Sequence, residues 1–248
     1  AMDKFNEHLS AKGIVFACSM YNIQHTVTPV NGKLQVKLEC ERPDVEIRYT
    51  MDGKEPTDRS SLYKNPLMVT GTQTIKCTTY RAGRQMGKTL TLPLVWNKAT
   101  AKPVLGNTQA GKILVNGIRG SLRQSDFEWH SWESSDSVAF TIDLQKKESL
   151  RSVSVGCITN YGMAAHKPAD IEVWVSNDNR DYRKVSGKQF TDGEIFREGT
   201  FKEDVVLDLN KEIGRYVRII AKGAGECPAT HVRPGQEARI YFDEVMIE

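Results

Sequence analysis

The sequence has no long hydrophobic run and no strong net charge. No stretch of about 18 consecutive apolar residues occurs in its 248 residues, so no membrane-spanning helix is predicted. The 34 basic and 31 acidic residues give a net charge of +3, and neither half carries a stripe of Lys and Arg. Proteins that bind nucleic acid need such a basic surface, so nucleic acid is not expected as a partner.

Cysteine is scarce and irregularly spaced. The chain has five cysteines and no Cys-x-x-Cys spacing, which argues against a zinc-finger type of site. Cys40, Cys77 and Cys157 fall on the apolar phase of strand-like segments, and free cysteines are commonly buried. We expect buried thiols, while a Cys40–Cys77 bridge between neighbouring strands stays open.

Apolar and polar residues alternate along most of the chain, which is the pattern of strands with one buried face. In the first part, the apolar positions are Leu34, Val36, Leu38, then Val45, Ile47, Tyr49, then Ile75, Cys77, Thr79, and Leu90, Leu92, Leu94. In the second part, the alternation occupies residues 138–144, 153–157, 171–175, 205–209, 217–221 and 240–245. Many short strands separated by loops predict an all-β protein built from two sandwiches.

The pattern also divides the chain. Residues 1–24 include a helix-like stretch at 3–12 and are expected to form a tail or connector from a preceding domain. Residues 25–97 form a first small sandwich, 98–111 are polar and turn-rich and are expected to be a linker, and 112–248 form the second sandwich. The long loops of the second sandwich, at 111–137, 157–169, 186–203 and 222–237, are the expected places for a binding site.

The first sandwich resembles a known domain. Residues 47–57 read IRYTMDGKEPT and are followed by Ser60, Tyr63 and Pro66. This resembles the signature of the β-sandwich that follows the catalytic barrel in many bacterial family-20 glycoside hydrolases (β-N-acetylhexosaminidases and chitobiases). The resemblance covers about 75 residues and implies an immunoglobulin- or fibronectin-like fold.

The second sandwich resembles a discoidin-like domain, also called coagulation factor V/VIII C-type, which is the fold of family-32 carbohydrate-binding modules. The matching pieces, in order, are VNGIRGS at 115–121, Trp129 and Trp132, FTIDL at 140–144, PADIEV at 168–173, SND at 176–178, GRYVRI at 214–219 and FDEV at 242–245. The resemblance implies a galactose-binding-like jelly roll.

Together the two resemblances imply the non-catalytic accessory region of a secreted β-N-acetylhexosaminidase. The second module would bind an N-acetylhexosamine- or galactose-containing glycan weakly and target the enzyme, located in the periplasm or outside the cell, to its substrate. The parent catalytic domain would be a partner in cis. The alternative is a pair of structural modules that brace the catalytic barrel and have lost the sugar site.

The loops hold the residue types that bind sugars. A sugar ring needs a flat aromatic face and a few directional polar groups. The long loops supply the candidates Trp132, Tyr161, His166, His231 and Arg233. Trp129 is expected in the core. Histidines on separate loops could converge on a metal, but such histidines are usually solvated, so no histidine metal site is predicted.

The resemblance also implies a structural calcium ion. In discoidin-like sugar modules, early-loop side chains and a late Glu hold Ca²⁺, and the matching positions are Asn116, Ser121 and Glu244. Asn116 stands where the family usually has Asp, so the site carries one negative charge less. Asp243 and Glu244 mimic the catalytic Asp-Glu pair of hexosaminidases, but no barrel surrounds them, so we expect them to hold loops or a cation and this chain to have no enzyme activity.

Overall fold

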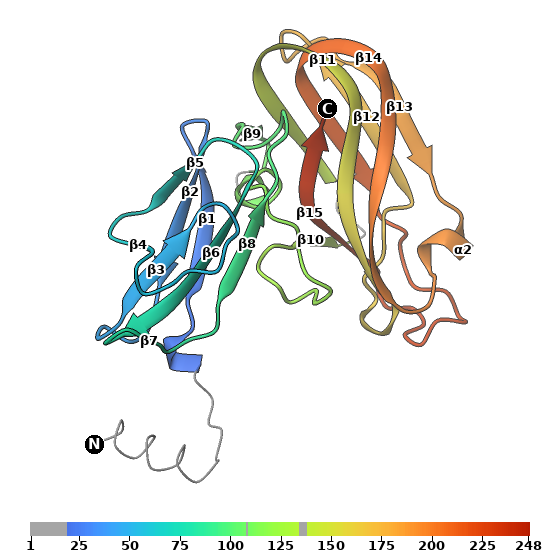
Figure 1. The fold of residues 1–248 in the computed structure, drawn as a ribbon. Helices are drawn as coiled ribbons and strands as arrows, with labels where there is room; N and C mark the ends of the chain where they lie inside the picture. The colour runs from blue at the N-terminus through green and yellow to red at the C-terminus, as the bar shows by residue number, and fades with distance from the viewer. Residues whose placement is uncertain (1–18, 108, 134–137) are drawn as a thin grey trace. The chain divides into compact units, whose positions relative to one another are not determined.

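The computed structural model describes residues 19–107, 109–133 and 138–248, and the regular secondary structure of these residues is almost all β-strand (Figure 1). The predicted all-β fold class is confirmed. The chain divides into two compact units, of which the first comprises Ala1–Val27 and Gln35–Leu94 and the second Thr28–Leu34 and Val95–Glu248. The helix expected at 3–12 lies outside the described residues. Within them, no helix is both long and apolar enough to cross a bilayer.

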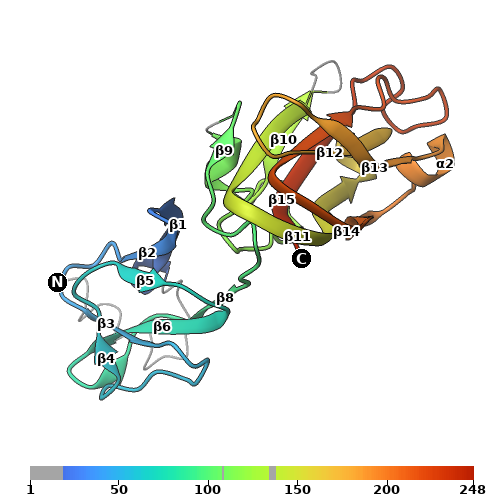
Figure 2. The ribbon, with the colours of Figure 1, turned by 90° about the horizontal axis from the view of Figure 1, so that it is seen from above.

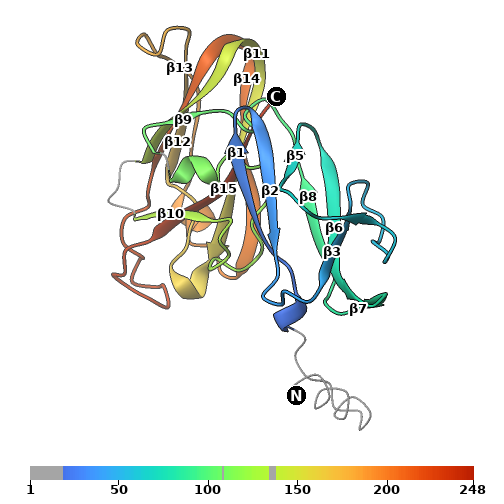
Figure 3. The ribbon, with the colours of Figure 1, turned by 90° about the vertical axis from the view of Figure 1, so that its left-hand side faces the viewer.

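Two antiparallel sheets make up the first part of the fold, after a short 3-10 helix, η1 (Ser19–Tyr21) (Figure 3). One sheet has the order β1-β2-β5 and the other β4-β3-β6-β7, with β8 also paired to β6. Their bounds are β1 Gln24–Val30, β2 Lys33–Glu39, β3 Glu46–Thr50, β4 Ser61–Leu62, β5 Leu67–Val69, β6 Gln73–Arg81, β7 Arg84–Gln85 and β8 Leu90–Leu94. The alternation predicted from the sequence sets the buried face, since Leu34, Val36 and Leu38 of β2 are buried while their neighbours are not.

Cys40 and Cys77 are not bridged. Cys77 is buried on β6, and burial raises the pKa of its thiol to about 12. Cys40 is free as well, and its thiol donates to the carbonyl oxygen of Met20 at 3.4 Å. The bridge that the sequence left open is therefore absent between these two residues.

The second unit is built around one seven-stranded antiparallel sheet with the order β10-β15-β11-β14-β12-β13, and β9 adds to β11 (Figure 2). The strands are β9 Val104–Leu105, β10 His130–Glu133, β11 Val138–Asn160, β12 Asp170–Ser176, β13 Arg183–Gln189, β14 Thr200–Lys222 and β15 Arg239–Ile247. Three short helices join them: η2 Ala110–Lys112, η3 Tyr161–Met163 and α2 Asp192–Ile195. The alternate apolar residues of β11, β12, β14 and β15 form one continuous core.

Strands β11 and β14 are each more than three times as long as the runs that the sequence pattern indicates. The predicted pairs of strands at 138–144 and 153–157, and at 205–209 and 217–221, are joined into two bent 23-residue strands that pair with each other. The bends coincide with register shifts between Asp143 and Glu148 and between Leu150 and Ser152. Positive φ angles occur in the same region at Gln145, Asn210 and Lys211. A bulge of this kind lets a strand turn a corner without ending, so the polar residues between the apolar runs did not mark loops.

The expected linker at 98–111 is instead part of the second unit. Ala99 and Ala110 are fully buried in its core, and Val104–Leu105 pairs with β11 as strand β9. The polar and turn-rich composition predicted a linker because only these few small or isolated apolar residues are buried. Small residues carry little hydrophobic signal although they fill tightly packed sites.

Candidate functional site

Three loops of the second unit meet at one end of the sheet: 161–169 after β11, 190–199 before β14, and 223–238 before β15 (Figure 1). Backbone hydrogen bonds tie them together. The amide of Tyr161 donates to Gly199 O at 3.0 Å, that of His166 to Arg239 O at 2.9 Å, and that of Phe190 to Ala169 O at 2.9 Å. The sheet thus supplies a rigid base on which side chains from three loops can be placed.

A pair of histidines occupies the centre of these loops. The Nε2 atoms of His166 and His231 lie 3.2 Å apart. His166 Nδ1 must donate to the carbonyl oxygen of Ile195 at 3.0 Å, whereas His231 Nδ1 must accept from the backbone N–H of Arg233 at 3.0 Å. These two contacts fix the tautomers, because each neutral ring has one proton. His231 therefore donates from Nε2 to the lone pair on His166 Nε2.

The histidine pair is held in the neutral form. His166 is 1% exposed and His231 is 4% exposed. Burial, aided by the neighbouring His231, lowers the pKa of His166 to about 4. Burial and the Arg233 guanidinium likewise lower the pKa of His231. Both rings are uncharged at neutral pH.

Tyr161 and Arg233 cover this pair on the solvent side. The Tyr161 ring is half-buried and packs on His231 with 3.9 Å between ring centroids, and its hydroxyl donates to Thr230 O at 3.4 Å. Arg233 is exposed, and its guanidinium donates to Gly162 O and to Gln236 Oε1. Since a guanidinium has five N–H groups, Arg233 keeps donors for a ligand while its position is fixed.

The structure thus brings four of the five predicted sugar-binding residues together but gives them different positions. Tyr161 and Arg233 face solvent. His166 and His231 do not reach the surface, and all four of their ring nitrogens are engaged within the protein. The expectation that the histidines contact a sugar directly is corrected here, because their rings support Tyr161 and Arg233 from below.

Trp132 lies apart from this group. It is on β10, half-buried, and stacks on Phe140 and Phe242 of the core with centroid distances of 6.3 and 5.3 Å. Trp129 is buried, as predicted, and its indole N–H donates to Ser121 O at 3.0 Å.

Sequence reasoning missed Phe196, Cys227 and Phe127. Phe196 packs edge-on against His166 at 4.9 Å, and it is placed by α2, whose capping box between Thr191 and Glu194 was a readable helix-start signal. Cys227 is buried beside the two histidines. Phe127 is 92% exposed in the loop before β10, although nothing in its local pattern distinguishes it from a buried aromatic residue.

The predicted calcium residues are partly assembled. Glu244 is fully buried, its Oε2 accepts the N–H of Gly117 at 3.0 Å, and its Oε1 has no hydrogen-bond partner among the described residues. Burial raises the pKa of Glu244 well above its usual range. An unpaired buried carboxylate oxygen fits a hard cation. Asn116, one residue from Gly117, is the second candidate ligand, and its Oδ1 also accepts the N–H of Ile118 at 2.9 Å. Ser121 is exposed and accepts the N–H of Arg123.

Asp243 holds the same loop in place. Its carboxylate is fully buried and accepts Arg119 Nε and Gly120 N–H, each at 2.9 Å, while Arg119 also pairs with Asp204. A Cβ at Gly156 would lie 1.9 Å from Asp243 Oδ1, so this position requires glycine. Asp243 thus has the loop-holding role that the sequence indicated.

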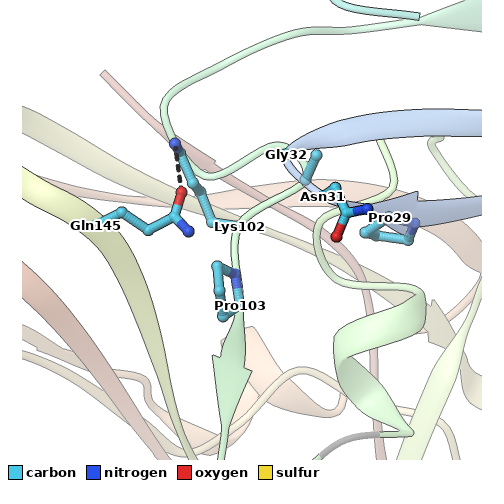
Figure 4. Close-up of a pocket in the computed structure, with 7 residues that line it drawn as sticks. Pro29, Asn31, Gly32, Lys102, Pro103 and Gln145 are labelled. Atoms are coloured by element: carbon cyan, nitrogen blue, oxygen red, sulfur yellow. Dashed lines mark hydrogen bonds between the residues drawn. The ribbon is translucent and has the colours of Figure 1, made fainter. Parts of the chain in front are cut away.

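A separate pocket of about 440 Å³ in the second unit contains none of the predicted residues (Figure 4). It is lined by Pro29, Asn31, Gly32, Ala101, Lys102, Pro103 and Gln145. Lys102 Nζ donates to Gln145 Oε1 at 3.3 Å across it. The lining has no aromatic ring on which a sugar could stack, so this pocket is not the candidate site.

Comparison with known proteins identifies both units. Residues 28–91 match the chitobiase/β-hexosaminidase C-terminal domain, and residues 98–233 match the F5/8 type C domain. No curated protein matches the chain.

Three solved structures illustrate the similarity, at levels that carry no information about the ligand of this chain. A CBM32 module produced by Clostridium perfringens, in complex with GlcNAc-α-1,4-galactose, is 18% identical with a TM-score of 0.37, and 62% of this chain and 94% of that one are covered. Chitosan-binding module 2 of Paenibacillus sp. IK-5, in complex with chitotriose, is 16% identical with a TM-score of 0.38, covering 61% and 98%. The C-terminal domain of a chitobiase from Bacteroides fragilis is 14% identical with a TM-score of 0.31, covering 53% and 76%.

The order of the two matched domains agrees with the two resemblances found in the sequence. Since the second match spans more than half of the chain, the protein belongs to the F5/8 type C domain family, with a chitobiase/β-hexosaminidase C-terminal domain ahead of that domain.

Proposed function

We propose that the second unit binds a glycan end through Tyr161 and Arg233, as the targeting module of a β-N-acetylhexosaminidase that acts in the periplasm or outside the cell. The observation that carries the proposal is the convergence of an aromatic ring and a fixed guanidinium, from two loops, on a buried polar base. Such a pair gives a sugar one apolar face to stack on and directional donors for its hydroxyls. The family assignment supports it, since the domain that precedes the second unit is of the chitobiase type.

The geometry implies weak binding by a single site. Tyr161 and Arg233 lie at the surface and not in a deep cavity, so a sugar buries little area there. A useful effect would come from attachment to a catalytic domain on the same chain, which converts substrate capture into an intramolecular step. Under the alternative, a structural module without a sugar site, the Arg233 guanidinium would only tie its loop to Gly162 and Gln236.

Glycan binding is tested by titrating the whole chain with N-acetylglucosamine, galactose, chitotriose and GlcNAc-α-1,4-galactose at millimolar concentrations, by calorimetry or by NMR. We expect binding of at least one of these, and Tyr161→Ala and Arg233→Ala are each expected to weaken it at least tenfold, about 1.4 kcal/mol. Tyr182→Ala and Arg180→Ala, in the loop between β12 and β13, are the matched controls and should leave affinity unchanged.

Two results would count against this assignment. Absence of binding to all four sugars and to a mucin-glycan array would support the structural alternative. Binding that is lost in Phe127→Ala but kept in Tyr161→Ala would move the site to the loop before β10.

We further propose that Glu244 anchors a structural Ca²⁺, with Asn116 as a second oxygen ligand. The Glu244 Oε1 atom supports this, because it has no hydrogen bond among the described residues and burial raises the pKa of the carboxyl, which disfavours its charged form. The raised pKa means that this carboxyl contributes its stability in the protonated form, below about pH 4.5, and that the contribution is lost as pH rises. A cation bound to the ionised carboxylate would restore this stability at neutral pH.

The calcium proposal predicts a melting-temperature shift. Ca²⁺ at 100 times its Kd should stabilise the second unit by about 2.7 kcal/mol, or about 2–4 °C per kcal/mol for a domain of this size. Glu244→Gln should abolish the shift and, in chelator, melt at or above the wild type. An exposed control, Glu198→Gln, should respond like wild type. A wild-type melting temperature unmoved by Ca²⁺ and by chelator would rule out the ion.

A further inference from the structure

Beneath Tyr161 and Arg233, the second unit holds a group of metal-ligating side chains that neither family assignment accounts for. His166, His231 and Cys227 are all buried, and one potential ligand atom from each lies within 4.8 Å of the other two. Within the described part of the chain, no hydrogen bond is found for the Cys227 thiol. The group packs beside the buried residues Ala164 and Ala238 and the partly buried Phe196.

We propose that His166, His231 and Cys227 form a binding site for one Zn²⁺ ion. Zinc takes imidazole nitrogen at about 2.0–2.1 Å and thiolate sulfur at about 2.3 Å in a tetrahedral arrangement, which places two nitrogen ligands about 3.3–3.4 Å apart. The two Nε2 atoms are 3.2 Å apart. The donor set of two imidazoles and one thiolate suits a borderline ion and not calcium, which requires oxygen ligands.

The surrounding backbone holds the three side chains in position. Cys227 and His231 share one loop, closed by Cys227 N–H to Gln236 O at 2.8 Å and by His231 N–H to Pro228 O at 2.9 Å. His166 comes from another loop, and its Nδ1–H donates to the Ile195 carbonyl, which leaves the Nε2 lone pair directed at the centre of the group. A ring N–H donated to a backbone carbonyl is the usual support of a metal-bound histidine.

Binding has a defined proton balance. The Cys227 thiol loses one proton to solvent, because only the thiolate binds the metal. The proton on His231 Nε2 moves to Nδ1, so the Arg233 N–H gives up its acceptor on that ring. His166 needs no change. One proton is therefore released per ion, and the fourth position of the tetrahedron is left for water.

Cobalt(II) provides the test, since it occupies zinc sites and has visible ligand-field bands. Titration of the reduced, metal-free full chain should give one tetrahedral Co²⁺ per chain with a thiolate-to-cobalt charge-transfer band, and Zn²⁺ should displace it. Cys227→Ser should lose the charge-transfer band, and His166→Asn should weaken Co²⁺ binding at least tenfold. Cys40→Ser is the matched control and should keep the full spectrum.

The proposal is overturned if Co²⁺ gives no charge-transfer band, or if the band survives in Cys227→Ser. A measurement on the wild type does not depend on how the variants fold: Zn²⁺ should slow alkylation of Cys227 at least tenfold, followed by peptide mass, and should release one proton in a weakly buffered solution. An alkylation rate of Cys227 unchanged by Zn²⁺ would also overturn it. None of these readouts involves a sugar, so glycan binding and zinc binding fail or succeed separately.

Discussion

Replacement of Asp243 by alanine is expected to destabilise the second unit by about 3–5 kcal/mol. The fully buried carboxylate is the acceptor for Arg119 and for the N–H groups of Gly120 and Glu244. Although burial opposes it, Asp204 and Asp243 together raise the pKa of Arg119, so the guanidinium stays charged when Asp243 is removed. In the variant, the Arg119 guanidinium loses one of its two carboxylate partners, and the N–H groups of Gly120 and Glu244 lose their acceptor. A buried polar group without a partner destabilises the folded state, because its lost hydration is not replaced.

Urea unfolding followed by tryptophan fluorescence measures this effect in the second unit alone, because Trp96, Trp129, Trp132 and Trp174, the four tryptophans of the chain, all lie within Val95–Glu248. Asp181→Ala, an exposed carboxylate between β12 and β13, is the control and should change stability by less than about 0.5 kcal/mol. A loss below about 1 kcal/mol in Asp243→Ala would show that the network does not hold the loop.

Lowering the pH should destabilise the second unit at pH values above those at which its carboxylates become protonated. The pKa of His166 is lowered to about 4 in the folded state from 6.5, so between these values the unfolded chain binds a proton that the folded chain excludes. Stability is then fully present above about pH 6.5 and falls by about 1.4 kcal/mol per pH unit as pH drops toward 4, a total on the order of 2–3 kcal/mol. The lowered pKa values of His231 and His130 act in the same direction.

Urea midpoints measured from pH 7 to 4.5 test this slope. His166→Asn keeps a donor for the Ile195 carbonyl but does not titrate, so its slope should be shallower than that of wild type by about one proton. Equal slopes in the two proteins would show that folding does not lower the pKa of His166.

The positions of the strands could be predicted from the sequence, but the residues at which they begin and end could not. Alternation is a local property, so Val36, Phe140 or Ile219 could be assigned to a buried face from its neighbours alone. The joining of two runs through Gln145 into β11 depends on the pairing of Glu148, Ser149 and Leu150 with residues 212–214 of β14, more than 60 residues away, and no local signal marks it. The burial of Ala99 and Ala110 was missed for a related reason. Alanine has a weak hydrophobic signal, and whether it is buried depends on residues that are distant in the sequence.

The candidate site was predictable in composition and not in arrangement. Tyr161, His166, His231 and Arg233 were candidates because of their types and their loops. Their positions depend on bonds across the fold, such as His166 to the Ile195 carbonyl, which are set only when three loops meet. The same reason explains Cys227, which lies in no periodic segment and becomes a neighbour of His166 only through the closing of the 223–238 loop.

The position of β15 has a consequence for how the second unit is made. The last strand of the sequence is not at an edge of the sheet but between β10 and β11, and it pairs His130 with Phe242 across more than 100 residues. Strand pairing over such separations is slow because a long loop must close first. During synthesis, the centre of this sheet therefore stays open until residue 247 has emerged, and β11 and β14 must be protected until then from pairing with other chains.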